Sequence, residues 1–130
     1  MAAMTRAAEA SAAAYRAFVQ GGWPALACAP EHGGQGLPML ITQLVNEFLC
    51  SANMAFAMYP GLTQGAIAAL IAHGSPELKA AYLPKMIAGE WTGTMNLTEP
   101  QAGSDLALIR SRAEPQADGT YKVFGQKIFI

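Results

Sequence analysis

Charged residues are scarce in this 130-residue sequence, and neither sign is in clear excess. Eight lysines and arginines stand against nine acids, which gives a formal net charge of −1. A nucleic-acid-binding protein carries a basic patch that neutralises phosphates, and this composition offers none. We therefore expect no nucleic-acid partner. The 52% hydrophobic content predicts a folded globular chain and not a disordered one.

Cysteine and histidine are equally rare. Cys28 and Cys50 are too few for a disulfide framework or a thiolate metal cluster, so we expect two free thiols in a reducing compartment. His32 and His73 lie far apart in the sequence without companions at ligand spacing, so no metal site is predicted. These features favour the cytoplasm as the location.

Long uninterrupted apolar runs are also missing. Arg6, Glu9 and Arg16 interrupt the alanine-rich amino terminus, which therefore lacks the apolar core of a signal peptide. No run reaches the roughly 18 apolar residues that a membrane span needs. We therefore expect no membrane span.

Apolar residues recur at helical spacing over much of the chain. This period predicts helices over residues 5–20, 39–59, 62–72 and 76–89. We expect the second to be mostly buried, to be either a helix pair or one kinked helix, and to end at Pro60; the fourth should bend or restart at Pro84. Gly21–Gly22 is expected to end the first helix, and Ser75 to cap the fourth. A long loop rich in proline and glycine separates the first two helices.

The period changes near Trp91. Apolar and polar residues then alternate over 91–98, over 108–115 and again after 119, which predicts strands. Ala117-Asp118-Gly119 is typical of a hairpin turn, and Gly125 of a bend. The sequence thus predicts a helical unit followed by the first strands of a sheet that it does not complete.

One loop carries most of the chemistry. MNLTEPQAGSDL (95–106) places hydroxyls, carboxylates and a glycine close together; YLPKMIAGEW precedes it and GQKIFI follows it. Together with EHGGQGLP at 31–38, these motifs resemble the acyl-CoA dehydrogenase family, and most closely the branch that includes 3-methylmercaptopropionyl-CoA dehydrogenases. The resemblance covers roughly residues 21–130.

The resemblance implies a multi-domain α+β fold. Residues 1–90 would be part of an all-α amino-terminal domain, and residues 91–130 the start of an antiparallel β-barrel middle domain that is incomplete here. The chain would then be a fragment of a flavoprotein of fatty acid metabolism. With FAD, the whole enzyme would convert an acyl-CoA thioester to an enoyl-CoA; the fragment itself is expected to be inactive.

The resemblance also implies the residues of the site. Backbone and side chains of the first flavin-contacting segment and of an aromatic-Ile pair would hold FAD, namely Met95, Asn96, Leu97, Thr98, Gly103, Ser104, Phe129 and Ile130. Gly103 would let the backbone approach a phosphate, and Ser104 would also contact the acyl-CoA. No catalytic base is expected in this chain, because we interpret Glu99 and Asp105 as residues that stabilise turns.

The implied partners are an acyl-CoA substrate and an electron-transfer flavoprotein, and a homo-oligomer (dimer or tetramer) is expected. Two alternatives stay open. The chain could be a non-catalytic binding or assembly module, or it could belong to a related flavoprotein of the same fold that uses oxygen or acts in a stress response. The presence of bound flavin would separate the first alternative from the enzyme.

Overall fold

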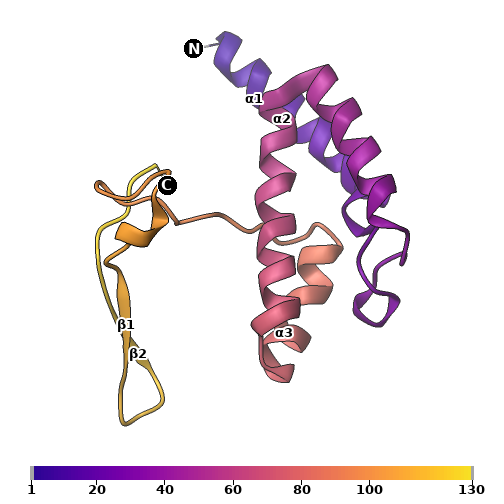
Figure 1. The fold of residues 1–130 in the computed structure, drawn as a ribbon. Coiled ribbons are helices and arrows are strands. Elements are labelled where there is room, and N and C mark those ends of the chain that lie inside the picture. Colours follow the sequence, from indigo (N-terminus) through magenta and orange to yellow (C-terminus); the bar gives the residue numbers. More distant parts are fainter. Residues whose placement is uncertain (1, 130) are drawn as a thin grey trace. The chain divides into compact units, whose positions relative to one another are not determined.

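The computed structural model describes residues 2–129, with side chains from residue 9 onward, and therefore says nothing of Ile130. The chain divides into two compact units, residues 1–93 (unit 1) and residues 94–130 (unit 2). Unit 1 contains the helices and unit 2 contains a two-stranded sheet (Figure 1). The expected order of a helical domain followed by antiparallel strands is confirmed.

The first helix, α1 (Ala2–Gln20), ends where the sequence predicts. The N–H of Gly22 donates to the carbonyl of Val19 at 2.9 Å, and Gly22 takes a left-handed conformation with φ of 74°. Glycine adopts this conformation without the steric cost that a Cβ would bring. The chain therefore turns away from the helix axis at this point.

The loop after α1 folds back on itself. It contains two short 3₁₀ helices, η1 (Trp23–Ala25) and η2 (Pro30–His32), each with a proline in its first turn. Two backbone hydrogen bonds then close the loop, from Gln35 to Ala25 at 2.9 Å and from Leu37 to Leu26 at 2.8 Å. The loop therefore has a defined path, although it is rich in proline and glycine.

The second helix, α2 (Met39–His73), is interrupted at Asn53 and not at Pro60. Asn53 has non-helical dihedrals (φ −161°, ψ 97°), and its side-chain oxygen accepts a hydrogen bond from the N–H of Phe56 at 3.0 Å. This is the geometry of an N-cap, so a new helical segment starts here. Pro60 lies buried inside that segment, and the prediction that it ends the helix is wrong.

The prediction that residues 39–59 are mostly buried is wrong, and the buried residues of α2 all lie in its second segment. Ala57, Thr63 and Ile67 are buried, whereas the large apolar side chains of residues 39–52 are mostly exposed. The exposed ones in this first segment are Met39, Leu40, Ile41, Leu44 and Phe48. The apolar residues of the first segment recur at helical spacing, but the face that they form remains largely open to solvent within the part of the chain that the structure describes.

By length and composition alone, α2 is long and apolar enough to cross a membrane. The expectation that no segment would meet these criteria is therefore wrong. The reason lies in the composition: Glu47 is the only Asp, Glu, Lys or Arg from Met39 to His73, a range that includes both helical segments on either side of Asn53. A core helix of a globular domain passes the same test, so the criteria carry little weight here.

The third helix, α3 (Pro76–Ile87), begins with the predicted cap. The hydroxyl of Ser75 accepts a hydrogen bond from the N–H of Leu78 at 3.3 Å, and Pro76 occupies the first turn. Pro84 lies inside the helix, which continues to Ile87 without the expected restart. The helix ends shortly before Gly89.

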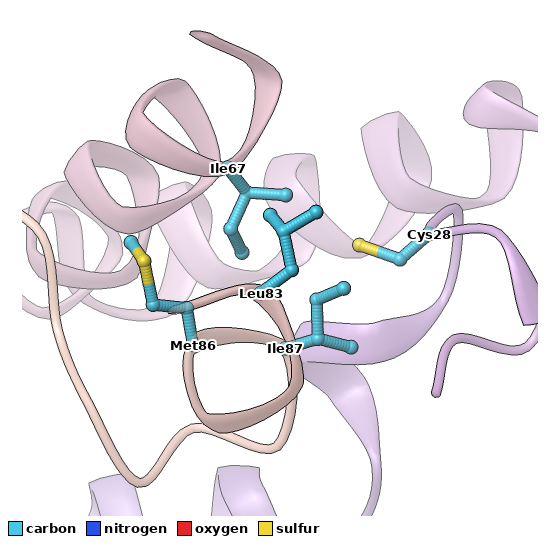
Figure 2. Packing of buried hydrophobic residues seen from close by; sticks show 5 residues of the cluster. All are labelled: Cys28, Ile67, Leu83, Met86 and Ile87. Atoms are coloured by element: carbon cyan, nitrogen blue, oxygen red, sulfur yellow. The ribbon is translucent and has the colours of Figure 1, made fainter. Parts of the chain in front are cut away.

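The core of unit 1 lies where α3 meets the second segment of α2 and the loop after α1. Leu83 and Ile87 of α3 are fully buried and pack with Met86, Ile67 and Cys28 (Figure 2). Burial also raises the pKa of the Cys28 thiol, and both cysteines are free. The core thus joins segments that lie far apart in the sequence.

Aromatic rings connect α1 to the second segment of α2. Tyr15 meets Tyr59 edge to face at 5.1 Å between ring centroids, and Phe18 meets Phe56 in the same way at 5.9 Å. Such edge-to-face pairs add about 0.5–1.5 kcal/mol beyond area burial. The Tyr15 hydroxyl also donates to the carbonyl of Gly89 at 3.2 Å, which ties the end of unit 1 to α1.

Unit 2 contains one antiparallel hairpin, β1 (Arg112–Pro115) and β2 (Tyr121–Phe124), with Arg112 opposite Phe124. The turn between the strands is the predicted one. Asp118 accepts hydrogen bonds from the N–H of Thr120 at 3.0 Å and from its hydroxyl at 2.7 Å. Gly125 bends the chain after β2, with φ of 149°, and lies directly against the side chain of Ser111.

The strand predicted over residues 91–98 is not formed in the structure. The segment has no neighbouring strand with which to form a ladder, although its apolar and polar residues alternate. Similarly, the strand predicted over 108–115 is shorter: Leu108 belongs to a 3₁₀ helix, η3 (Leu106–Leu108), and β1 begins only at Arg112. Alternation shows which residues can pair, whereas a strand also requires a partner.

Replacing Leu83 with alanine should remove buried side-chain atoms from the centre of the core. We expect the free energy of unfolding of unit 1 to fall by about 2–5 kcal/mol. The measurement is urea unfolding followed by circular dichroism at 222 nm. Leu78→Ala is the matched control, because Leu78 lies on the same helix but is 46% exposed; an equal loss in both variants would contradict the assigned core.

Candidate functional site

The predicted flavin-contacting motif begins as an extended, exposed segment of unit 2. Met95, Asn96 and Leu97 are exposed, and Thr98 is half-buried. Within residues 2–129, the N–H groups of Leu97 and Thr98 donate to no protein acceptor. The segment therefore presents backbone donors on its surface, as the predicted contact with a polar ring edge requires.

A tight turn follows at residues 99–102. The N–H of Ala102 donates to the carbonyl of Glu99 at 3.0 Å, and the N–H of Glu99 donates back to the carbonyl of Ala102 at 3.0 Å. Pro100 occupies the first central position of the turn, where its fixed φ is favourable. The turn reverses the chain and brings Gly103 back beside Thr98.

The carboxylate of Glu99 is at the centre of the loop and is only 2% exposed. Its Oε2 accepts hydrogen bonds from the side chain of Gln101 at 2.6 Å and from the N–H of Arg110 at 2.8 Å. Its Oε1 accepts from the N–H of Ser111 at 3.0 Å and from the ammonium of Lys127 at 2.9 Å. We call the Glu99 carboxylate and these four donors the Glu99 clamp.

The Glu99 clamp lowers the pKa of its own carboxyl group. The neighbouring Ser111 hydroxyl, the N–H of Arg110 and the ammonium of Lys127 hold the pKa of Glu99 well below its ordinary value near 4.5. Hydrogen bonds and a positive charge both favour the ionised form. Glu99 therefore holds the loop as an ionised hydrogen-bond acceptor, in agreement with its interpretation as a residue that stabilises a turn.

A second contact joins the motif to the end of the chain. The Lys127 ammonium also donates to the carbonyl of Leu97 at 3.0 Å, and the N–H of Ile128 donates to the carbonyl of Thr98 at 3.0 Å. Residues 97–98 and 127–128 therefore lie side by side. The two residues that precede the predicted Phe129–Ile130 pair thus lie beside the first predicted segment.

The remaining predicted site residues lie outside the contacts between residues 97–98 and 127–128. Gly103 and Ser104 are exposed and follow the turn, and Asp105 caps η3 by accepting a hydrogen bond from the N–H of Ala107 at 3.1 Å. This agrees with the structural role expected for Asp105. Phe129 is 89% exposed and takes a positive φ of 57°, while Ile130 lies outside the described residues.

Sequence reasoning missed the role of Lys127. The signal was present, because Lys127 is the only charged residue in the apolar stretch VFGQKIFI, and a lone charge among apolar residues needs a partner. Its partner, Glu99, is 28 positions away, so no local spacing rule connects the two. The same applies to Gln101, whose side chain also donates to the carbonyl of Leu108 at 3.1 Å.

Unit 1 also contains a candidate binding surface. An open groove of about 1100 Å³ lies between α1 and residues 49–59 of α2 and is lined mainly by apolar and aromatic side chains. Among the residues that the structure describes, no three His, Cys, Asp or Glu side chains come close enough to hold a metal ion. The loop of unit 2 therefore has the most convergent polar groups.

Comparison with known proteins identifies the family. A family model described as the acyl-CoA dehydrogenase N-terminal domain matches residues 1–90. The chain belongs to the acyl-CoA dehydrogenase family. It is 55% identical over 117 residues to 3-methylmercaptopropionyl-CoA dehydrogenase of Ruegeria pomeroyi, a match that covers 90% of this chain and 20% of that relative. The resemblance of the sequence motifs to this branch of the family is confirmed.

Solved structures agree with this assignment. The crystal structure of an acyl-CoA dehydrogenase complexed with FAD from Bacillus anthracis has a TM-score of 0.78 and 30% identity, and the match covers 90% of this chain and 20% of that one. A structure reported for the electron transferring flavoprotein of Acidaminococcus fermentans has a TM-score of 0.81 and 27% identity, covering 88% of this chain and 30% of that one. The chain thus spans about a fifth to a third of these proteins.

The lowered pKa of Glu99 predicts how the stability of unit 2 depends on pH. A carboxyl group whose pKa is lower in the folded state stabilises the fold above its unfolded pKa, and this contribution is lost as the pH falls below it. We expect wild type to exceed Glu99→Gln in stability at pH 7, with a difference that shrinks below about pH 4.5. Urea unfolding followed by amide signals of unit 2 at several pH values measures this.

Glu114→Gln is the control for this titration. Glu114 is an exposed acid of β1 in the same unit, and its carboxylate pairs with Arg112. We expect it to remove little of the pH dependence. A difference between wild type and Glu99→Gln that is the same at pH 7 and pH 3 would show that the ionised carboxylate does not hold the loop.

Proposed function

We propose that this chain takes part in FAD-dependent dehydrogenation of an acyl-CoA thioester to an enoyl-CoA. Its loop in unit 2 would hold one edge of the flavin. The observation that carries the proposal is that the Glu99 clamp joins MNLTEPQAGSDL to GQKIFI, two motifs whose contacting residues Leu97 and Lys127 are 30 positions apart. Membership of the family supplies the cofactor and the class of reaction.

The residues of the loop fit a flavin. The backbone N–H groups of Leu97 and Thr98 can donate to the polar edge of its ring, because no protein acceptor within residues 2–129 takes them. Gly103 has no packing reason to be glycine, since an added Cβ would meet only Thr98 Cγ2 at 4.0 Å. A small residue at an open surface position suits the close approach of a phosphate.

Each residue of the loop has a role that follows from its chemistry. When bound, FAD supplies the hydride acceptor that the protein lacks. Thr98 offers a hydroxyl and a backbone donor to the ring, Ser104 offers a hydroxyl to a phosphate and to the acyl-CoA, and Phe129 offers an aromatic face. Met95 and Asn96 lead into this segment and would line it.

We assign no base for the reaction to the loop of unit 2. Abstraction of a proton next to a thioester needs a base within hydrogen-bond reach, and such help contributes about 10²–10⁴ in rate. Glu99 and Asp105 are the acids of the loop, and hydrogen bonds within the protein engage both. The proposal therefore assigns flavin positioning to residues 1–130 and no catalytic residue.

The partners belong to the same proposal. The substrate would be an acyl-CoA, and an electron-transfer flavoprotein would accept the electrons; a related structure comes from work on such a flavoprotein in Acidaminococcus fermentans. We further propose a homo-oligomer, because the apolar first segment of α2 is largely exposed. The proposed location is the cytoplasm, the compartment expected from the sequence.

Ser104→Asp should weaken the binding of FAD, because a carboxylate placed beside the phosphates adds repulsion between like charges. We expect the Ser104→Asp variant, expressed from its own gene, to keep less than half of its flavin through purification, as measured by absorbance near 450 nm. Ser11→Asp adds the same charge at an exposed position of α1 and should keep its flavin. Equal flavin content in both variants would contradict the site.

Residues 1–130 alone should not turn over acyl-CoA. The assay uses excess FAD, a panel of short to long acyl-CoA thioesters and an artificial electron acceptor. Because no free base is present in the loop, we expect no reduction above the protein-free control. Turnover above that control would contradict the proposal that this chain holds no catalytic base.

A further inference from the structure

The ammonium of Lys127 lies between the two halves of the proposed flavin site. It donates to the carbonyl of Leu97 at 3.0 Å and to Oε1 of Glu99 at 2.9 Å, and both acceptors belong to the first half. Lys127 itself precedes Phe129 by two positions in the second half. One side chain therefore holds the second half against the first.

The surroundings of this ion pair give it little freedom. The side chain of Lys127 is 23% exposed and that of Glu99 is 2% exposed, and each oxygen of the Glu99 carboxylate already accepts two hydrogen bonds. Removing one partner of such a pair leaves the other charge buried without compensation. The pair therefore cannot loosen without disturbing the backbone that it connects.

The position of Phe129 depends on the same connection. Its ring is 89% exposed, and its φ of 57° is uncommon for a residue with a Cβ. The hydrogen bond from the N–H of Ile128 to the carbonyl of Thr98 and the Lys127 contacts are what hold the preceding residues. The backbone position of Phe129 is thus set by the contacts of the two residues before it, Lys127 and Ile128.

We propose that Lys127 and Glu99 are positioning residues for the flavin: their ion pair fixes residues 127–129 in register with residues 97–104 and thereby sets how long FAD is retained. The inference rests on the proposed function, because it assumes that these two segments contact FAD. Neither residue touches the reacting atoms in this scheme. Their effect is transmitted through the backbone of Leu97, Thr98 and Ile128.

The test uses the protein expressed from its own gene and loaded with FAD. Lys127→Met keeps the length of the side chain but removes its charge, so we expect the rate constant of FAD dissociation to rise about tenfold or more. The measurement is the increase in flavin fluorescence after dilution. Lys127→Arg can still donate to both acceptors and should restore the rate to within about threefold of wild type.

Two further variants separate positioning from other effects. Lys122→Met removes an exposed cation from β2, and Asp118→Ala removes the hydrogen bonds of the hairpin turn; neither residue contacts the Glu99 clamp. Both should release FAD at the wild-type rate. If Asp118→Ala released FAD as fast as Lys127→Met at equal loss of stability, the effect would be one of general stability and the proposal would be overturned.

The double variant Glu99→Gln/Lys127→Met tests whether the pair acts as a unit. When two residues act only through each other, their effects are not additive. We expect the double variant to release FAD no faster than the faster of the two single variants. Multiplied effects would show that the two residues act independently, against the proposal.

A measurement without flavin makes this test independent of the proposed function. In Lys127→Met without FAD, the amide of Ile128 should lose its protection from hydrogen exchange, while amides of α3 keep theirs. Unchanged protection of Ile128 would overturn the positioning role even if the wild type binds FAD. Lost protection in a protein that binds no FAD would instead refute the proposed function and leave the ion pair as a structural contact alone.

Discussion

Unit 2 depends on the carboxylate of Glu99 because it has almost no apolar core. Among residues 94–129 the buried ones are Glu99 and Ala102, and the sheet described there is a two-stranded hairpin with Val123 74% exposed. An isolated hairpin of this kind is marginally stable in water. Within residues 94–129, four hydrogen bonds to one carboxylate fix the path of the loop.

Unit 1 is held together in the opposite way. Leu83, Ile87 and Ile67 form an apolar centre, and edge-to-face aromatic pairs add α1 to it. Apolar burial is non-directional and tolerates small shifts, whereas hydrogen bonds to a carboxylate require defined distances and angles. This difference between the two units suits the proposed function, because a loop that positions a cofactor needs directional contacts and a supporting helical unit does not.

Local signals in the sequence predicted much of this fold. Gly22, Ser75 and Asp118 act within a few residues of themselves, and the structure shows the helix end, the helix cap and the turn that each one predicts. Where a local prediction failed, the structure was decided by another residue than the one on which the prediction rested. Asn53 restarts α2 because its side chain caps the next segment, a signal that the more conspicuous Pro60 concealed.

Long-range contacts were beyond the sequence alone. Whether residues 91–98 form a strand, or residues 39–52 are buried, depends on a neighbour that no local pattern specifies. The candidate site shows the same limit. The residues that we propose to contact flavin were predicted from the motif that contains Leu97 and Gly103, whereas the pairing of Glu99 with Lys127 is visible only in the folded chain.

The sharing of the Glu99 oxygens also has an evolutionary consequence. Each oxygen serves two donors, one of which is a backbone N–H that no substitution other than proline removes. A single replacement at position 99 therefore leaves donors from several segments unmatched, and a single replacement at 127 leaves a buried negative charge. Divergence at either position passes through a disfavoured intermediate, so related sequences should retain both residues or exchange them together.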